Sequence, residues 1–168
     1  NPFFAGPFQD CLIGKADLKE ELSKGWLEKW KWPGTAEDLL KYWFGTGNNL
    51  DADVYESIPQ ITIPKVLATN QEKYRTDFLN KEFNYEKIFE KTFSSAYLGS
   101  KKPEQEFFEG IYAYFRKNIP DIKKDEVLFW DDDIKNIEGA QKFGFTAIQF
   151  INFNDYRSKM AEFGLLTA

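Results

Sequence analysis

The feature that most constrains the fold is the alternation, after residue 64, of short apolar runs with segments of helical periodicity. Helical patterns begin near Gln71 and at Pro103, and a third passes through Ile137 and Ala140. Alternating strands and helices predict an α/β fold, in which a parallel sheet is joined by crossover helices. The four apolar runs have the length of buried strands and occupy residues 65–68, 92–95, 127–130 and 146–150.

The chain before this alternation carries helical patterns only. One apolar stripe begins near Asp17 and predicts a single helix, and a second helix is expected to start at Thr35 with Asp38 as its capping-box partner. A turn-rich GTGNN sequence follows it. We therefore predict a small helical lobe at residues 1–48 and an α/β core at residues 49–168. The residues of the stripe recur every fourth position: Leu18, Leu22, Trp26 and Trp30.

Composition excludes several classes of partner. The 168 residues include 27 acidic and 22 basic side chains, a net charge of -5, and no lysine-rich or arginine-rich run of the kind that grips nucleic acid. No apolar run approaches the roughly 20 residues of a membrane-spanning helix. We expect a soluble protein with no nucleic-acid or membrane partner.

Two residue types limit the possible chemistry. The single cysteine, Cys11, cannot form an internal disulfide, and its use suits a reducing compartment, so we expect a cytoplasmic protein in which Cys11 is a small buried hydrophobe. The absence of histidine excludes nucleophiles activated by histidine and zinc sites built on imidazole. Carboxylate, lysine and hydroxyl chemistry remains.

Polar residues follow three of the predicted strands. In open parallel sheets ligands bind outside the carboxyl ends of the strands. Thr69 and Asn70 leave the first run, Lys101 and Lys102 follow the second, and Asp131–Asp133 leave the third. This order predicts a rim that carries a hydroxyl, an ammonium and a carboxylate cluster, the complementary groups that hold a phosphate and a divalent cation.

Each of these residues also has a plain structural interpretation. Asn70 can cap the following helix, and Thr69 can be an ordinary strand-end residue. Lys102 can be a solvated loop lysine, and the three aspartates can form an acidic first turn at the positive end of a helix dipole. The occurrence of complementary groups at three separate strand ends favours the ligand-binding interpretation.

Three sequence motifs together resemble those of the haloacid dehalogenase (HAD) superfamily of hydrolases that use an aspartate nucleophile. VLATN at residues 66–70 resembles the second motif of the family, and GSKKPE at residues 99–104 resembles the third, with Lys102 as its lysine. FWDDDIKN at residues 129–136 resembles the fourth, including Asn136 in the following helix. The resemblance covers roughly residues 50–150 and implies a Rossmann-like core, with the helical lobe as its cap.

The resemblance implies a Mg²⁺-dependent hydrolase, and we expect a phosphatase of a small phosphorylated metabolite. In the family an aspartate attacks phosphorus and forms an aspartyl-phosphate. Asp132 is expected to coordinate Mg²⁺ directly, with Asp131 beside it. Lys102 would stabilise the transferring phosphoryl group, while the Thr69 hydroxyl and the Asn70 N–H at a helix start would hold phosphate oxygens.

The first motif of the family, an apolar strand that ends in Asp-x-Asp, has no match in this sequence. The nearest similar sequence, DADV at residues 51–54, follows turn residues, and we expect Asp51 to cap a helix. The chain also starts at Asn1, not at methionine. We therefore expect the sequence to begin inside the protein, downstream of a strand and loop of about 15 to 20 residues, and the chain alone to be inactive.

Two alternatives stay open at this level. A haloacid dehalogenase would use the same nucleophile on carbon without a metal, which the neighbouring Asp131 and Asp132 argue against. A catalytically inactive relative would use the aromatic-rich helical lobe to bind a partner. The sequence specifies neither the substrate nor the oligomeric state.

Overall fold

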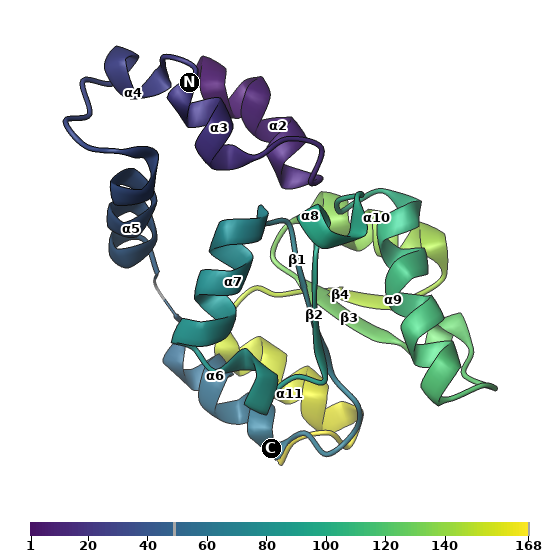
Figure 1. Ribbon diagram of the computed structural model, residues 1–168. Coiled ribbons are helices and arrows are strands. Elements are labelled where there is room, and N and C mark those ends of the chain that lie inside the picture. The colour runs from purple at the N-terminus through teal and green to yellow at the C-terminus, as the bar shows by residue number, and fades with distance from the viewer. Residues whose placement is uncertain (49, 168) are drawn as a thin grey trace. The chain divides into compact units, whose positions relative to one another are not determined.

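The computed structural model describes residues 1–48 and 50–167, which form a mixed α/β fold with parallel strands, as the sequence predicts. Figure 1 shows the helices and strands in order along the chain. The chain divides into two compact units. One unit contains residues 1–50 and 66–101, and the other contains residues 51–65 and 102–168. In the described residues, no helix is both long enough and apolar enough to cross a membrane.

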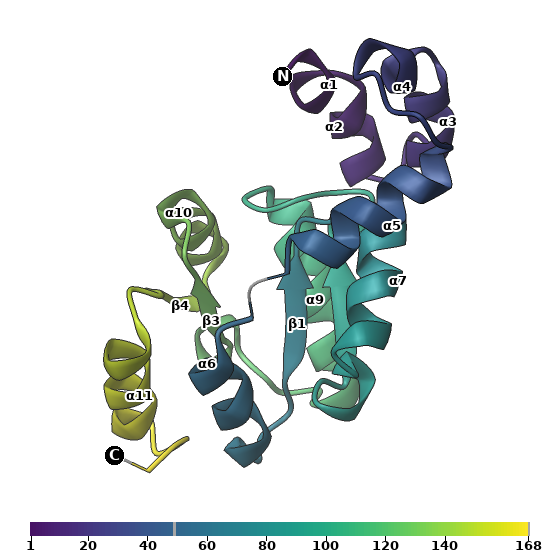
Figure 2. The same ribbon diagram turned by 90° about the vertical axis from the view of Figure 1, so that its left-hand side faces the viewer.

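The second unit is built on two parallel strands, β3 (Leu128–Asp131) and β4 (Thr146–Gln149). Figure 2 shows this pair between α10 and α11. In register, Leu128 is opposite Thr146 and Asp131 is opposite Gln149. The helices of this unit are α6 (Ala52–Ser57), α9 (Gln105–Asn118), α10 (Ile134–Phe143) and α11 (Phe153–Glu162), with short 3₁₀ turns at Ile58–Gln60 and Lys124–Glu126.

The alternation of side chains along β3 gives the strand two different faces. Phe129 lies against Phe108 of α9, with ring centroids 5.5 Å apart, whereas Trp130 lies on the opposite face against Tyr156 of α11, with centroids 5.0 Å apart. Asp131, two residues after Phe129, shares the α9 and α10 face. The strand therefore delivers a carboxylate to the end of a face otherwise packed with aromatic rings.

The regular elements of residues 1–48, in the first unit, are all helices. These helices enclose a core in which Phe3 and Leu22 have no exposed surface. The predicted capping box is confirmed, because Thr35 and Asp38 exchange hydrogen bonds at the start of α5. The helices are α1 (Pro2–Ala5), α2 (Pro7–Leu12), α3 (Leu18–Ser23), α4 (Trp26–Lys29) and α5 (Ala36–Thr46).

The single helix predicted from Asp17 is in fact two, α3 and α4. Asp17 caps α3 as expected, but Gly25 adopts a left-handed φ of 93° and separates the helices. Glycine takes this conformation without the penalty that a Cβ imposes. The leucines and tryptophans that recur at every fourth position pack around one shared core, although they lie on two helices and not on one.

The rest of the first unit is a parallel strand pair with its own helices. β1 (Val66–Thr69) pairs with β2 (Lys91–Ser94), so that Thr69 is opposite Ser94. This part of the unit is completed by α7 (Lys73–Glu82), the 3₁₀ turn Tyr85–Lys87 and α8 (Ser95–Leu98).

The predicted lobe boundary after residue 48 stays a prediction, and Asn49 lies outside the described residues. Within the described chain the two compact units instead group the helical segment with β1 and β2.

Candidate functional site

A buried ion pair stands at the carboxyl end of β3. The Nζ of Lys102 lies 2.6 Å from Oδ2 of Asp131, and the two side chains are only 10% and 5% exposed. The Lys102 ammonium also lies 5.9 Å from the centre of the Phe129 ring. The sequence predicted that these two residues share one rim, and the structure brings them into direct contact.

The other oxygen of Asp131 organises the start of α10. Its Oδ1 accepts hydrogen bonds from the Asp133 backbone N–H and from Nδ2 of Asn136, both at 2.9 Å. Asp133 in turn caps α10 by accepting from the Lys135 N–H, as expected for a helix-start residue. A carboxylate offers about four acceptor positions, and the described partners occupy three of them. Asp131 therefore keeps one acceptor position for a further ligand.

Asp132 differs from its neighbour, because its side chain is exposed. Its backbone carbonyl accepts from Nε2 of Gln149 at 2.9 Å, which ties this turn to β4. The sequence favoured Asp132 over Asp131 for direct metal coordination. Asp131 is held in a defined orientation by Lys102 and Asn136, and the order in which the two carboxylates would coordinate a metal stays a prediction.

Lys101 has a different partner from Lys102. Its Nζ donates to Oε1 of Gln9 at 2.7 Å, within the first unit. The two adjacent lysines are therefore distinguished by their contacts as well as by the position of Pro103. Lys102 contacts Asp131, an acidic residue of the predicted rim.

Thr69 and Asn70 lie in the first unit at the end of β1, and both are half-buried. The expectation that the Asn70 N–H stands at a helix start was wrong. α7 begins at Lys73 and is capped by Glu72, which accepts from the backbone N–H groups of Tyr74 and Arg75. Asn70 therefore belongs to the loop between β1 and that cap, and its capping interpretation is wrong for the same reason.

Ser94 is a buried polar residue that the sequence did not single out. It ends β2 opposite Thr69, is fully buried, and its Oγ has no hydrogen-bond partner among the described residues. A buried hydroxyl without a partner is costly. No sequence pattern distinguishes Ser94 from Ser95, whose Oγ donates to the Gln71 carbonyl.

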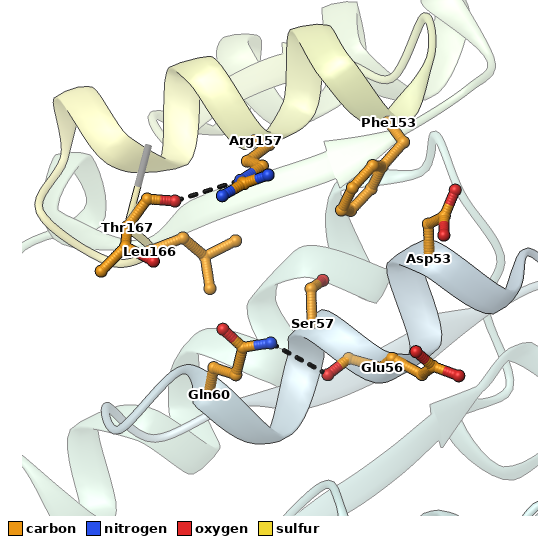
Figure 3. Close-up of a pocket in the computed structure, with 8 residues that line it drawn as sticks. All are labelled: Asp53, Glu56, Ser57, Gln60, Phe153, Arg157, Leu166 and Thr167. Carbon is orange, nitrogen blue, oxygen red and sulfur yellow. Dashed lines mark hydrogen bonds between the residues drawn. The ribbon is translucent and has the colours of Figure 1, made fainter.

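In the part of the chain that the structure describes, no strand precedes the aspartates at residues 51 and 53. Asp51 caps α6, and its side chain accepts from the Val54 N–H at 3.1 Å, as predicted. Asp53 lines a polar pocket of about 230 Å³ between α6 and α11 (Figure 3). In this pocket Arg157 donates from Nε to the Thr167 carbonyl, opposite Glu56 and Gln60 of the α6 side. The pocket contains none of the predicted site residues.

Comparison with known proteins identifies the fold. No family model matches the chain, and no curated protein matches its sequence. A HAD family enzyme, bt-2542 from Bacteroides thetaiotaomicron, is similar with a TM-score of 0.77 at 18% identity, over 95% of this chain and 79% of that chain. A predicted HAD-like family hydrolase from Porphyromonas gingivalis gives a TM-score of 0.74 at 20% identity, over 96% and 80%.

A third similar structure, with a lower TM-score, is that of a dehalogenase. L-2-haloacid dehalogenase from Xanthobacter autotrophicus, solved with chloropropionic acid covalently bound, gives a TM-score of 0.61 at 14% identity, over 98% of this chain and 68% of that chain. The enzyme from Bacteroides thetaiotaomicron has been solved as a magnesium complex and with magnesium and inorganic phosphate. Together these structures show that the chain has a HAD-like fold.

Proposed function

We propose that this chain forms the phosphate-holding and cation-holding part of a HAD-like hydrolase that acts on a small phosphorylated metabolite. The observation that carries the proposal is the buried pair of Lys102 and Asp131 at the carboxyl end of β3, with Asn136 on the same carboxylate. The magnesium and phosphate complexes of the structurally similar Bacteroides enzyme support it.

The donor set at this strand end suits Mg²⁺. Mg²⁺ prefers oxygen ligands and usually binds through one or two carboxylates while keeping several waters. Asp131 has an acceptor position left after its three described hydrogen bonds, and the exposed Asp132 is the next residue. Among the described residues, no group of three or more acidic, histidine or cysteine side chains is placed to hold a metal ion together, so the protein would supply few of the ligands. We therefore assign the cation to Asp131 first and Asp132 second, and its role would be to neutralise phosphate charge.

The roles of the protein groups follow from their chemistry. Lys102 is held by Asp131 and would stabilise negative charge on the transferring phosphoryl group, because a preorganised ammonium needs little rearrangement during the reaction. Thr69 is proposed to bind a phosphate oxygen through its hydroxyl. Asn70 is proposed as a loop contact to phosphate, without the helix-start geometry.

The attacking group of the proposed reaction is an aspartate that these residues do not supply. No Asp-x-Asp follows an apolar strand in this sequence, and Asp51 is engaged as a helix cap. In the described part of the chain, β3 pairs with β4 on one edge and with no strand on the other. We therefore propose that residues 1–168 alone release no phosphate.

A substrate panel tests the function. The complete protein, incubated with a panel of small phosphomonoesters and Mg²⁺, should release inorganic phosphate from some of them and release no halide from 2-haloacids. Halide release without phosphate release would identify a dehalogenase instead. Absence of both activities, with a correctly folded protein, would favour the inactive binding protein.

A further inference from the structure

Gly139 of α10 lies unusually close to Pro103. A Cβ added to Gly139 would stand 2.6 Å from Cβ of Pro103 and 2.7 Å from its carbonyl oxygen. Real Cβ contacts essentially never fall below 3.0 Å, and one of these two atoms belongs to the backbone, which cannot rotate away. Only glycine lets α10 approach residue 103 this closely.

A hydrogen bond reinforces the contact. Nε2 of Gln105 donates to the Gly139 carbonyl oxygen at 3.0 Å. The segment that follows Lys102 is therefore fixed to α10 at two points, by close packing at Pro103 and by the Gln105 amide. Both lie within one compact unit of the chain.

The two fixed segments converge on one carboxylate. Lys102 directly precedes Pro103 and donates to Oδ2 of Asp131, while Asn136 lies about one helical turn before Gly139 and donates to Oδ1. Any shift of α10 away from Pro103 would therefore move Lys102 and Asn136, two of the three donors to Asp131, relative to each other.

We propose that Gly139 is a positioning residue that sets Lys102 against Asp131, a role that rests on the proposed phosphate-binding function. A lysine side chain is long and flexible, so its position depends on how its backbone is held. A displacement of about 1 Å at a reacting site can cost about 100-fold in rate. Gly139 limits that displacement by allowing the backbone of α10 to contact Pro103.

The close contact with Pro103 changes the effect that an alanine at position 139 is expected to have. Within a helix, glycine is less favourable than alanine, so Gly139→Ala would stabilise a helix that had free space at this position. At the observed distances the added methyl group must instead move α10 or Pro103. The exposed neighbour Glu138 gives the matched control, because Glu138→Ala adds no atom to this contact.

The experiment is a double-mutant cycle on affinity for inorganic phosphate in the presence of Mg²⁺. The proteins are the wild type, Gly139→Ala, Lys102→Ala and the double variant, with Glu138→Ala as control. We expect Gly139→Ala to weaken phosphate binding about tenfold in the wild-type background but less than about twofold in the Lys102→Ala background. Equal losses in both backgrounds, or unchanged affinity in folded Gly139→Ala, would overturn the positioning role.

Two further measurements keep the failure of the proposed function distinct from the failure of this inference. If Lys102→Ala leaves phosphate affinity unchanged, the proposed function fails. The NMR signal of the Lys102 ammonium then decides the positioning role, which requires a shifted signal in Gly139→Ala and an unshifted signal in Glu138→Ala. If Gly139→Ala does not fold, Gln105→Met should move the same signal without adding a methyl group at Gly139, and an unmoved signal would overturn the role.

Discussion

The Nζ of Lys102 lies 2.6 Å from Oδ2 of Asp131, and both side chains are almost completely buried. Burying two charges is costly unless their geometry is good and the remaining acceptor positions are satisfied. The Asp133 N–H and the Asn136 amide satisfy the second oxygen of Asp131. The fold thus holds a lysine and a carboxylate in fixed orientation at a strand end, where open parallel sheets bind their ligands.

Lys102→Ala should reduce turnover of a phosphomonoester by about 100-fold or more, because a preorganised charge at the phosphoryl site is lost. Lys101→Ala should have little effect, since the Lys101 ammonium donates to Gln9 and Lys101 does not precede Pro103. The measurement is kcat/KM of the complete protein, with thermal melting as a check on folding. Equal losses in the two variants would show that the lysine is assigned to the wrong position.

Asp131→Asn should weaken Mg²⁺ binding more than Asp132→Asn. Asp131 is oriented by two side chains, whereas the Asp132 carboxylate is exposed. Calorimetric titration of Mg²⁺ into each variant measures the difference, and Asp133→Asn is the control because Asp133 is engaged as the cap of α10. A larger loss in Asp132→Asn would restore the order that the sequence suggested.

Glu72 should make the first unit less stable as the pH rises. Burial raises the pKa of Glu72 above its ordinary value of 4.5, an effect partly offset by the hydrogen bonds from Arg75 and Tyr74. Between the pKa of Glu72 in the unfolded state and its higher pKa in the folded state, the folded protein binds more protons than the unfolded one. The free energy of unfolding therefore falls as the pH rises through this range. Glu72→Gln keeps an acceptor for the helix cap but removes the charge.

Urea unfolding of the wild type and Glu72→Gln between pH 4 and pH 8 measures this effect. The stability of the variant relative to the wild type should increase from below pH 4.5 upward and then level off once Glu72 is ionised in both states. A wild type that gains stability over the variant as the pH rises would contradict the assigned direction of the pKa shift.

Cys11 should resist thiol reagents in the folded protein. The residue is 2% exposed, and burial, with smaller contributions from nearby carboxylates led by Glu21, raises the pKa of its thiol to about 11. The reactive thiolate is therefore scarce at neutral pH. Labelling with a chromogenic disulfide at pH 7.5 should be slow in buffer and complete in denaturant. Rapid labelling of the folded protein would show that Cys11 is accessible.

The strand positions could be predicted from the sequence because short apolar runs between helical patterns have few alternatives. β1 to β4 begin and end within one residue of the predicted runs. The helix predicted through Trp26 was wrong because apolar spacing alone does not reveal that Gly25 turns the backbone. Asn70 was misplaced because Glu72, a residue type less often expected as a cap, caps α7, which begins at Lys73.

The candidate site was predicted only in part. Strand ends identified Lys102 and Asp131, but the pairing of Asp131 with Lys102 and the exposure of Asp132 depend on side-chain positions that sequence spacing does not encode. No sequence pattern pointed to Gly139, because its proposed role rests on a close contact with Pro103, 36 positions earlier in the chain. Such long-range contacts appear only when the fold is known.

The central claim is that Lys102 and Asp131 hold a phosphate together with Mg²⁺, and calorimetric titration with inorganic phosphate tests it most directly. The titration is performed on the wild type and on Lys102→Ala, each with Mg²⁺ and with a chelator. The account predicts binding to the wild type with Mg²⁺, and weaker binding both after chelation and in Lys102→Ala. Absence of phosphate binding by the folded wild type, or an affinity that neither chelation nor Lys102→Ala changes, would contradict it.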